Sequence, residues 1–242
     1  MKTKTNCDRR FSSAGIQRRV FLKNVLLIGT GTMVGGMISL EGCRPGSKME
    51  DSPAEILMRQ HGMLARLMLV YDKCSQDLSA GKSFPIEALR NAALIIRSYI
   101  EDFHENLEGE ILFPYCSKSD SLSWLVQLLY IQHAAGRKLT DRILSLCQDT
   151  SFPDPERGLK LSQHMTEFNR MYRLHAAWED TVLLPELKKL LGQDHNSSLA
   201  EEISRRQQEV LGINGTENLL DRIAAIERML EIHQLWQVTP EG

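Results

Sequence analysis

Two segments of the chain place a histidine, a glutamate and a proline at the same spacing. Each segment reads His-x-x-x-Glu with a proline ten residues after the histidine. The two copies are His104, Glu108 and Pro114, and His175, Glu179 and Pro185. Residues i and i+4 of an α-helix lie on one face, one turn apart. Each copy can therefore present an imidazole and a carboxylate to one point, which is the chemistry of a metal ligand pair.

Two further histidines extend this repeat. His61 precedes the first copy and His133 precedes the second, 72 residues later, while the histidines and glutamates of the two copies are 71 residues apart. A shift this constant predicts a helical hairpin used twice, related by a pseudo-twofold axis. The alternative is four unrelated surface histidines, in a chain that has seven histidines in total.

Four imidazoles and two carboxylates in a helical core would specify a metal site. All four histidines lie 16–19 residues from the same end of their expected helices, about 24–29 Å along the axis, so they can converge. Ligation by nitrogen and oxygen without thiolate favours iron, with manganese as an alternative, over a structural zinc site. The inventory suits two ions with bridging carboxylates, an oxo or hydroxo group from solvent, and about one open position on each ion.

Helix signals surround these residues and no segment alternates with period two, so no sheet is expected. Ser52-Pro53-Ala54-Glu55 is a capping box, and Asp154 is a second N-cap. Long helices are expected over 53–80, 85–116, 121–148 and 155–191. Their short connections predict an all-α, up-down-up-down four-helix bundle.

A shorter helical segment follows the predicted bundle. Ser198 with Glu201 is expected to cap a fifth helix that ends before Gly212, and Thr216 to open a sixth. The chain is therefore divided into a leader over 1–43, a bundle over 53–192 and a C-terminal two-helix extension over 193–242.

The first 43 residues have the character of an export leader. Arg18 and Arg19 are followed by Val-Phe-Leu-Lys and then by an uncharged, glycine-rich run over 24–40, which resembles a twin-arginine signal. Leu40-Glu41-Gly42-Cys43 resembles a lipoprotein cleavage box, although Glu41 stands where a small residue is usual. These features predict the twin-arginine export machinery as a partner and a location in the periplasm or on the outer face of the membrane.

An ordinary membrane anchor is the alternative reading of this leader. Otherwise, membrane contact is expected only through the leader or through a lipid on Cys43. Export implies an oxidising compartment, and Cys74, Cys116 and Cys147 remain beyond the leader as an odd set without a CxxC motif. They predict neither a thiolate metal cluster nor a disulfide framework.

Charge argues against nucleic acid as a partner. Of 29 basic and 31 acidic residues in the chain, residues 1–43 hold seven and two, so the remainder carries a formal net charge of −7. Binding to phosphate needs clustered lysine and arginine, which an acidic body does not supply.

Over residues 53–192 the pattern resembles the hemerythrin family in its HHE cation-binding branch, and the tail resembles the two-helix extension of many HHE proteins. The resemblance implies a four-helix bundle with a non-heme di-iron centre that binds or processes dioxygen, nitric oxide or peroxide in oxidative or nitrosative stress handling or sensing. The ligands implied are His61, His104, Glu108, His133, His175 and Glu179.

One position departs from the oxygen-carrying hemerythrins. These have a fifth histidine one turn after the third, and this chain has Arg137 there. The resemblance therefore favours an enzymatic or repair role over simple oxygen storage, and leaves open whether the protein is an enzyme. The alternatives are an iron donor, an iron store, an iron–sulfur repair protein, or a helical binding module that uses metal only to stabilise its core.

Several nearby residues need a role. Glu101 and His104 form an ExxH pair as in ferritin-like di-iron proteins, but Tyr172 stands where the second pair would need a glutamate. Tyr130 and Tyr172, each three residues before a ligand histidine, are either outer donors and gates or ordinary core aromatics. His164 is expected to be a core or entrance residue, and His195 and His233 to be on the surface.

Overall fold

The computed structural model describes residues 51–149, 151–234, 236 and 239. The predicted leader, with its arginine pair and Cys43, lies outside these residues. Throughout the described part the regular structure is helical, which confirms the all-α prediction. No helix in that part is both long enough and apolar enough to cross a bilayer.

Two long helical runs carry the first half of the repeat. Helix α1 (Pro53–Ser79) begins with the predicted capping box, in which Ser52 and Glu55 satisfy each other's backbone N–H groups. The second run extends without a break from Ile86 to Cys116. It consists of α2 (Ile86–Ile95), η1 (Ile96–His104), α3 (Glu105–Leu107), η2 (Glu108–Leu112) and α4 (Phe113–Cys116), where η marks a π-helical segment.

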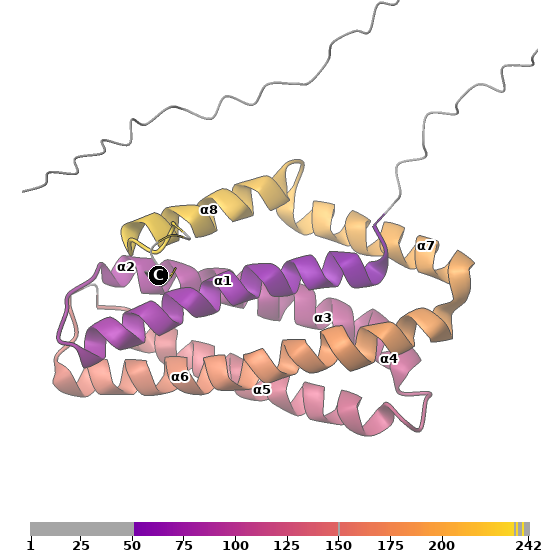
Figure 1. The fold of residues 1–242 in the computed structure, drawn as a ribbon, viewed down its shortest axis with the longest axis horizontal. Helices are drawn as coiled ribbons and strands as arrows, with labels where there is room; N and C mark the ends of the chain where they lie inside the picture. Colours follow the sequence, from indigo (N-terminus) through magenta and orange to yellow (C-terminus); the bar gives the residue numbers. More distant parts are fainter. Residues whose placement is uncertain (1–50, 150, 235, 237–238, 240–242) are drawn as a thin grey trace, which may run out of the picture. The chain divides into compact units, whose positions relative to one another are not determined.

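The second half repeats this plan. Helix α5 (Ser123–Leu146) is followed by α6 (Pro155–Trp178), which Asp154 caps as predicted. Next come η3 (Glu179–Leu183) and α7 (Leu184–Leu211). Helix α6 packs against both α1 and α5, and α5 packs against α2, η1 and α4, so the two halves enclose one apolar core (Figure 1).

A π-helical turn begins at each glutamate of the repeat, because η2 starts at Glu108 and η3 at Glu179. A proline six residues further on, Pro114 or Pro185, has no N–H to donate and its ring crowds the carbonyl four residues earlier. The wider turn before each proline relieves this conflict. Such turns are frequent at functional sites, and they aim each carboxylate into the core.

The fifth helix begins at a kink rather than at the predicted cap, Ser198. Gly192 has a positive φ of 66° inside α7, and the helix resumes directly after it instead of starting at Ser198. The Asn196 amide donates to the Gly192 carbonyl at 2.6 Å and stabilises this early restart. Helix α8 (Gly215–Met229) then folds back against α1 and α2 (Figure 1).

Gly136 on α5 makes room for a buried tyrosine from α6. A Cβ atom at Gly136 would lie 2.1 Å from the Tyr172 hydroxyl oxygen, and Tyr172 is almost fully buried. The hydroxyl donates to the Glu105 carboxylate at 2.5 Å. The missing side chain at Gly136 is therefore what lets Tyr172 reach Glu105 across the core.

We expect Gly136→Ala to lower the free energy of unfolding by about 1–3 kcal/mol, because the added methyl group overpacks a buried site. Gly62→Ala is the matched control, since a Cβ there meets nothing within 4 Å, and it should stabilise the helix by about 0.5–1 kcal/mol. Denaturant unfolding of both variants measures the difference. Equal effects of the two changes would contradict the assigned role of Gly136.

Candidate metal centre

All six residues predicted as ligands come together in the core. His61 comes from α1, His133 from α5, and the two His-x-x-x-Glu pairs from the π-containing runs. Their nitrogen and oxygen atoms form two groups in which the candidate ligand atoms lie within 4.8 Å of one another. One group is His61, His104, Glu108 and Glu179, and the other is Glu108, His133, His175 and Glu179.

The two groups share both glutamates, so each pairs two histidines with the same two carboxylates. In the first group the Nε2 atoms of His61 and His104 are 3.2 Å apart, and in the second the Nε2 atoms of His133 and His175 are 3.1 Å apart. Two ligands about 2.1 Å from an ion and at right angles to each other are about 3.0 Å apart. The spacing therefore fits neighbouring ligands of a single ion in each group.

The distances between the carboxylate oxygens and the histidine nitrogens also fit neighbouring ligands of one ion. Glu179 oxygens lie 3.2 Å from His175 Nε2 and 3.3 Å from His61 Nε2. Glu108 oxygens lie 3.4 Å from His104 Nε2 and 3.5 Å from His133 Nε2. Both side chains are fully buried, yet none of their four oxygens receives a hydrogen bond of ordinary geometry. Buried carboxylates without partners are costly, and a bound cation removes that cost.

Three of the four histidines are held from outside by an acceptor at Nδ1. His61 Nδ1 lies 2.7 Å from Asp180 Oδ1, His104 Nδ1 lies 2.6 Å from Gln60 Oε1, and His175 Nδ1 lies 3.0 Å from Gln132 Oε1. An acceptor at this position keeps the proton on Nδ1 and leaves the Nε2 lone pair facing the carboxylates. This is the usual outer arrangement of a metal-binding histidine.

The two carboxyl groups have opposite pKa shifts. Burial raises the pKa of Glu108 well above its ordinary value, and the nearby Glu179 carboxylate raises it further. Burial also opposes ionisation of Glu179, but His175 and His61 outweigh it and lower the pKa of that carboxyl. The positive charge of the protein groups alone thus favours ionisation of one of the two carboxyl groups. A divalent cation would favour ionisation of both.

The pKa values of the histidines also shift in opposite directions. Burial lowers the pKa of His104 and that of His133, the latter to about 3. Burial opposes protonation of His61 as well, but its hydrogen bond with Asp180 and the nearby Glu179 carboxylate raise its pKa to about 10. A cation bound at the first group would take the place of the proton on His61, so its binding is coupled to proton release.

Neutral glutamines were missed as site residues by the sequence analysis. Gln60 precedes His61 and Gln132 precedes His133, and each accepts a hydrogen bond from the histidine of the neighbouring His-x-x-x-Glu pair. A repeated Gln-His dipeptide at a shift of 72 is the signal that could have found them. The Gln60 amide is itself held by the extension, since its Nε2 donates to Gln207 Oε1 at 2.8 Å.

Glu101 does not face the cluster. Its oxygens accept from Thr140 Oγ1 at 2.5 Å and pair with Arg97 at 2.8 Å. The ferritin-like ExxH reading therefore has no support at this position. Its neighbour Glu105 pairs with the Tyr172 hydroxyl and with Arg137, and burial raises the pKa of Glu105 to about 8.

The other tyrosine and histidine side chains discussed in the sequence differ in burial and in their distance from the cluster. Tyr172 is buried beside His175, with ring centroids 5.3 Å apart. Tyr130 is 46% exposed and so is not a core aromatic. His164 is partly buried and lies outside both groups, 3.7 Å from Glu167. His195 and His233 are exposed, as expected.

Cysteine plays no part in either group. Cys74, Cys116 and Cys147 are buried and free.

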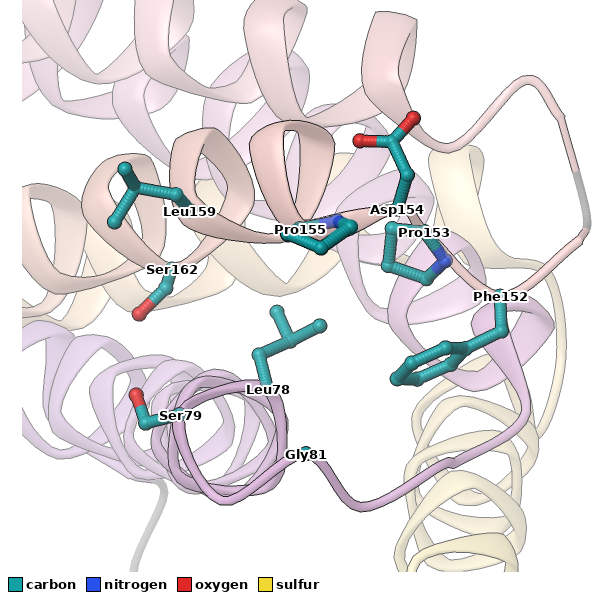
Figure 2. A pocket seen from close by; sticks show the side chains of 10 residues that line it. Leu78, Ser79, Gly81, Phe152, Pro153, Asp154, Pro155, Leu159 and Ser162 are labelled. Carbon is teal, nitrogen blue, oxygen red and sulfur yellow. The ribbon is translucent and has the colours of Figure 1, made fainter.

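Figure 2 shows a pocket of about 390 Å³ between the end of α1 and the start of α6. Leu78, Phe152 and Leu159 are among its apolar lining residues, and its carboxylate, Asp154, is the N-cap of α6. None of the six clustered residues lines it. The residues with metal-binding chemistry therefore lie elsewhere, in the core.

We expect Glu108→Met to abolish metal binding yet to raise the stability of the metal-free protein by about 1–3 kcal/mol. The change removes a buried carboxyl whose oxygens lack hydrogen-bond partners. Glu167→Met, an exposed change on α6, is the control and should leave both properties nearly unchanged. Metal analysis and denaturant unfolding after chelation measure the two effects. A large loss of metal-free stability in Glu108→Met would contradict the assignment.

We expect Gln132→Leu to weaken metal binding about 10- to 100-fold, because His175 loses the acceptor that fixes its tautomer. Gln127→Leu lies on the same helix at an exposed position and should bind as the wild type does. Competition with a chelator of known affinity measures both. Equal affinities in the two variants would show that Gln132 has no such role.

Comparison with known proteins agrees with this geometry. Residues 52–187 match the hemerythrin HHE cation binding domain. The chain is 33% identical over 229 residues to the uncharacterized protein Mb2018 of Mycobacterium bovis and to the uncharacterized protein Rv1995 of Mycobacterium tuberculosis. These alignments cover 88% of this chain and 89% of each relative. No solved structure gives a significant match.

The matched region contains every residue of the two ligand groups and both of their π-helical glutamate turns. The chain is therefore a member of the hemerythrin HHE cation-binding family, with a cluster of histidine and glutamate side chains suited to a metal ion.

Proposed function

We propose that the protein binds two iron ions and uses them to bind or react with dioxygen, nitric oxide or peroxide. His61 and His104 would hold one ion, His133 and His175 the other, and Glu108 and Glu179 would bridge them. The main support is that both buried glutamates belong to both ligand groups while their four oxygens lack hydrogen-bond partners. Manganese is the alternative metal, since it accepts the same ligands.

The up-down-up-down arrangement of four helices is part of this proposal. It accounts for the contacts of α6 with α1 and α5 and for the meeting of ligands that lie at similar depth in four helices. The division into a bundle over 53–192 and an extension over 193–242 is also proposed. The kink at Gly192 supports a boundary there.

Ligand count supports small-molecule chemistry over a purely structural ion. Each group offers two nitrogens and two shared carboxylates, fewer donors than a six-coordinate ion accepts, and a catalytic or binding metal needs such an open position. A redox-active ion would supply the electron-transfer and ligand-binding chemistry. The protein supplies fixed histidine tautomers, buried carboxylates and an apolar surrounding.

Arg137 bears on the reaction type. Its guanidinium turns away from the cluster and pairs with Glu105 and Asp102, each at 3.1 Å. It therefore adds no nitrogen ligand, and the second group keeps only two histidines. This favours a centre that reacts with or senses its ligand over one that stores oxygen reversibly.

Export through a twin-arginine-type leader is proposed from the sequence of residues 1–43, as are a periplasmic or outer-face location and a lipid on Cys43. Such a route delivers proteins after folding, which suits a centre that must be loaded with metal. The oxidising compartment would also match a role in oxidative or nitrosative stress.

Anaerobic loading with ferrous iron tests the function. We expect about two irons per chain and, on mixing with nitric oxide or dioxygen, new visible bands from ligand-to-metal charge transfer. His104→Ala should lose most of the iron and the bands, whereas His195→Ala, at an exposed position, should keep both. Two tightly bound irons that react with none of these molecules would instead favour the structural binding module, and a single zinc would refute the di-iron centre.

A further inference from the structure

The two halves of the repeat differ at the residue after each shared glutamate. Asp180 follows Glu179, and Gly109 follows Glu108, at the same shift of 71 residues. The Asp180 carboxylate lies 2.7 Å from His61 Nδ1. At the corresponding place beside His133, Gly109 has no side chain, and within the described part of the chain His133 Nδ1 has no hydrogen-bond partner.

A surface pocket of about 320 Å³ lies at this place. Its lining includes Gly109 and Glu105 from the second helical run and Tyr130, His133 and Arg137 from α5. His133 is thus both a candidate ligand and part of the pocket wall. On the other side of the centre, the Asp180 carboxylate stands against His61 instead.

Tyr130 lines this pocket from α5. Its hydroxyl donates to the Gly109 carbonyl at 2.9 Å, and its ring packs edge-on against Phe113 with centroids 4.9 Å apart. Phe113 in turn stacks on the His133 ring at 5.6 Å. A Cβ at Gly109 would lie 3.3 Å from Tyr130 Cε1. The glycine therefore lets the Tyr130 ring pack closely against the helix while His133 still lines the pocket.

The charges in the pocket are already paired. Arg137 is held by Glu105 and Asp102, and Glu110 pairs with Arg206 at 2.7 Å. The lining therefore offers no free cation to hold an anion. It suits a small neutral molecule such as dioxygen, nitric oxide or hydrogen peroxide.

We propose that this pocket is the binding and access site through which small neutral molecules reach the centre, and that they react at the ion held by His133 and His175. The inference rests on the proposed function and goes further by choosing one side of the centre. It predicts two ions that differ in reactivity although their direct ligands are alike.

Gly109→Asp tests the proposal by placing a carboxylate before His133, as Asp180 stands before His61. In the ferrous protein we expect nitric oxide to associate about tenfold more slowly, as followed by stopped-flow absorbance. Release of iron to a colorimetric chelator should also slow, because His133 gains an outer partner. Gln127→Glu adds the same charge at an exposed position of α5 outside the pocket lining, and should leave both rates within about twofold of wild type.

Tyr130→Ala is an independent variant that adds no side chain at residue 109. Removing the ring should speed nitric oxide association several-fold, and Tyr115→Ala, at a similarly exposed tyrosine, should not. Unchanged association in both Gly109→Asp and Tyr130→Ala would overturn the proposal while leaving the di-iron function intact. Iron binding without any nitric oxide reaction in the wild type would overturn both. If Gly109→Asp does not fold, the Tyr130→Ala result decides.

Discussion

The structure depends on two carboxyl groups, Glu108 and Glu179, that are fully buried beside each other with no hydrogen bond to either. Such a pair is unfavourable in a low-dielectric core unless positive charge compensates it. The surrounding features serve to hold it in place. A π-helical turn aims each carboxylate inward, and outer acceptors keep three imidazoles with Nε2 facing it. The apolar core therefore encloses a cluster suited to a cation.

Sequence predicted the parts of this site that depend on periodicity. The repeat of His-x-x-x-Glu at a shift of 71 identified four of the six clustered residues, because helical spacing alone decides which side chains share a face. The shift of 72 between His61 and His133 added the other two. Caps at Ser52 and Asp154 were predictable for the same local reason. The start of the fifth helix was not, because a positive φ at Gly192 together with the Asn196 amide restarts the helix before the expected cap.

Contacts between helices could not be read from the sequence. The acceptors Gln60 and Gln132 are ordinary polar residues until the helices pack and bring them against histidines 44 and 43 positions away. From the sequence, Gly136 is only a residue that weakens a helix. Its role becomes clear in the structure, where the Tyr172 hydroxyl occupies the space that a Cβ at residue 136 would need. Pairwise packing of this kind depends on rotation and register, which one-dimensional patterns leave undetermined.

The two halves of the internal repeat agree at the candidate ligands and differ beside them. Positions that hold the ligands correspond in both halves, down to the glutamine before His61 and the one before His133. The position after the shared glutamate does not correspond, since Asp180 supports His61 whereas Gly109 leaves His133 beside a pocket. A duplicated hairpin alone would make two equivalent sites. The difference between Asp180 and Gly109 gives the two halves different outer partners, and such partners tune a metal ligand as well as shielding it.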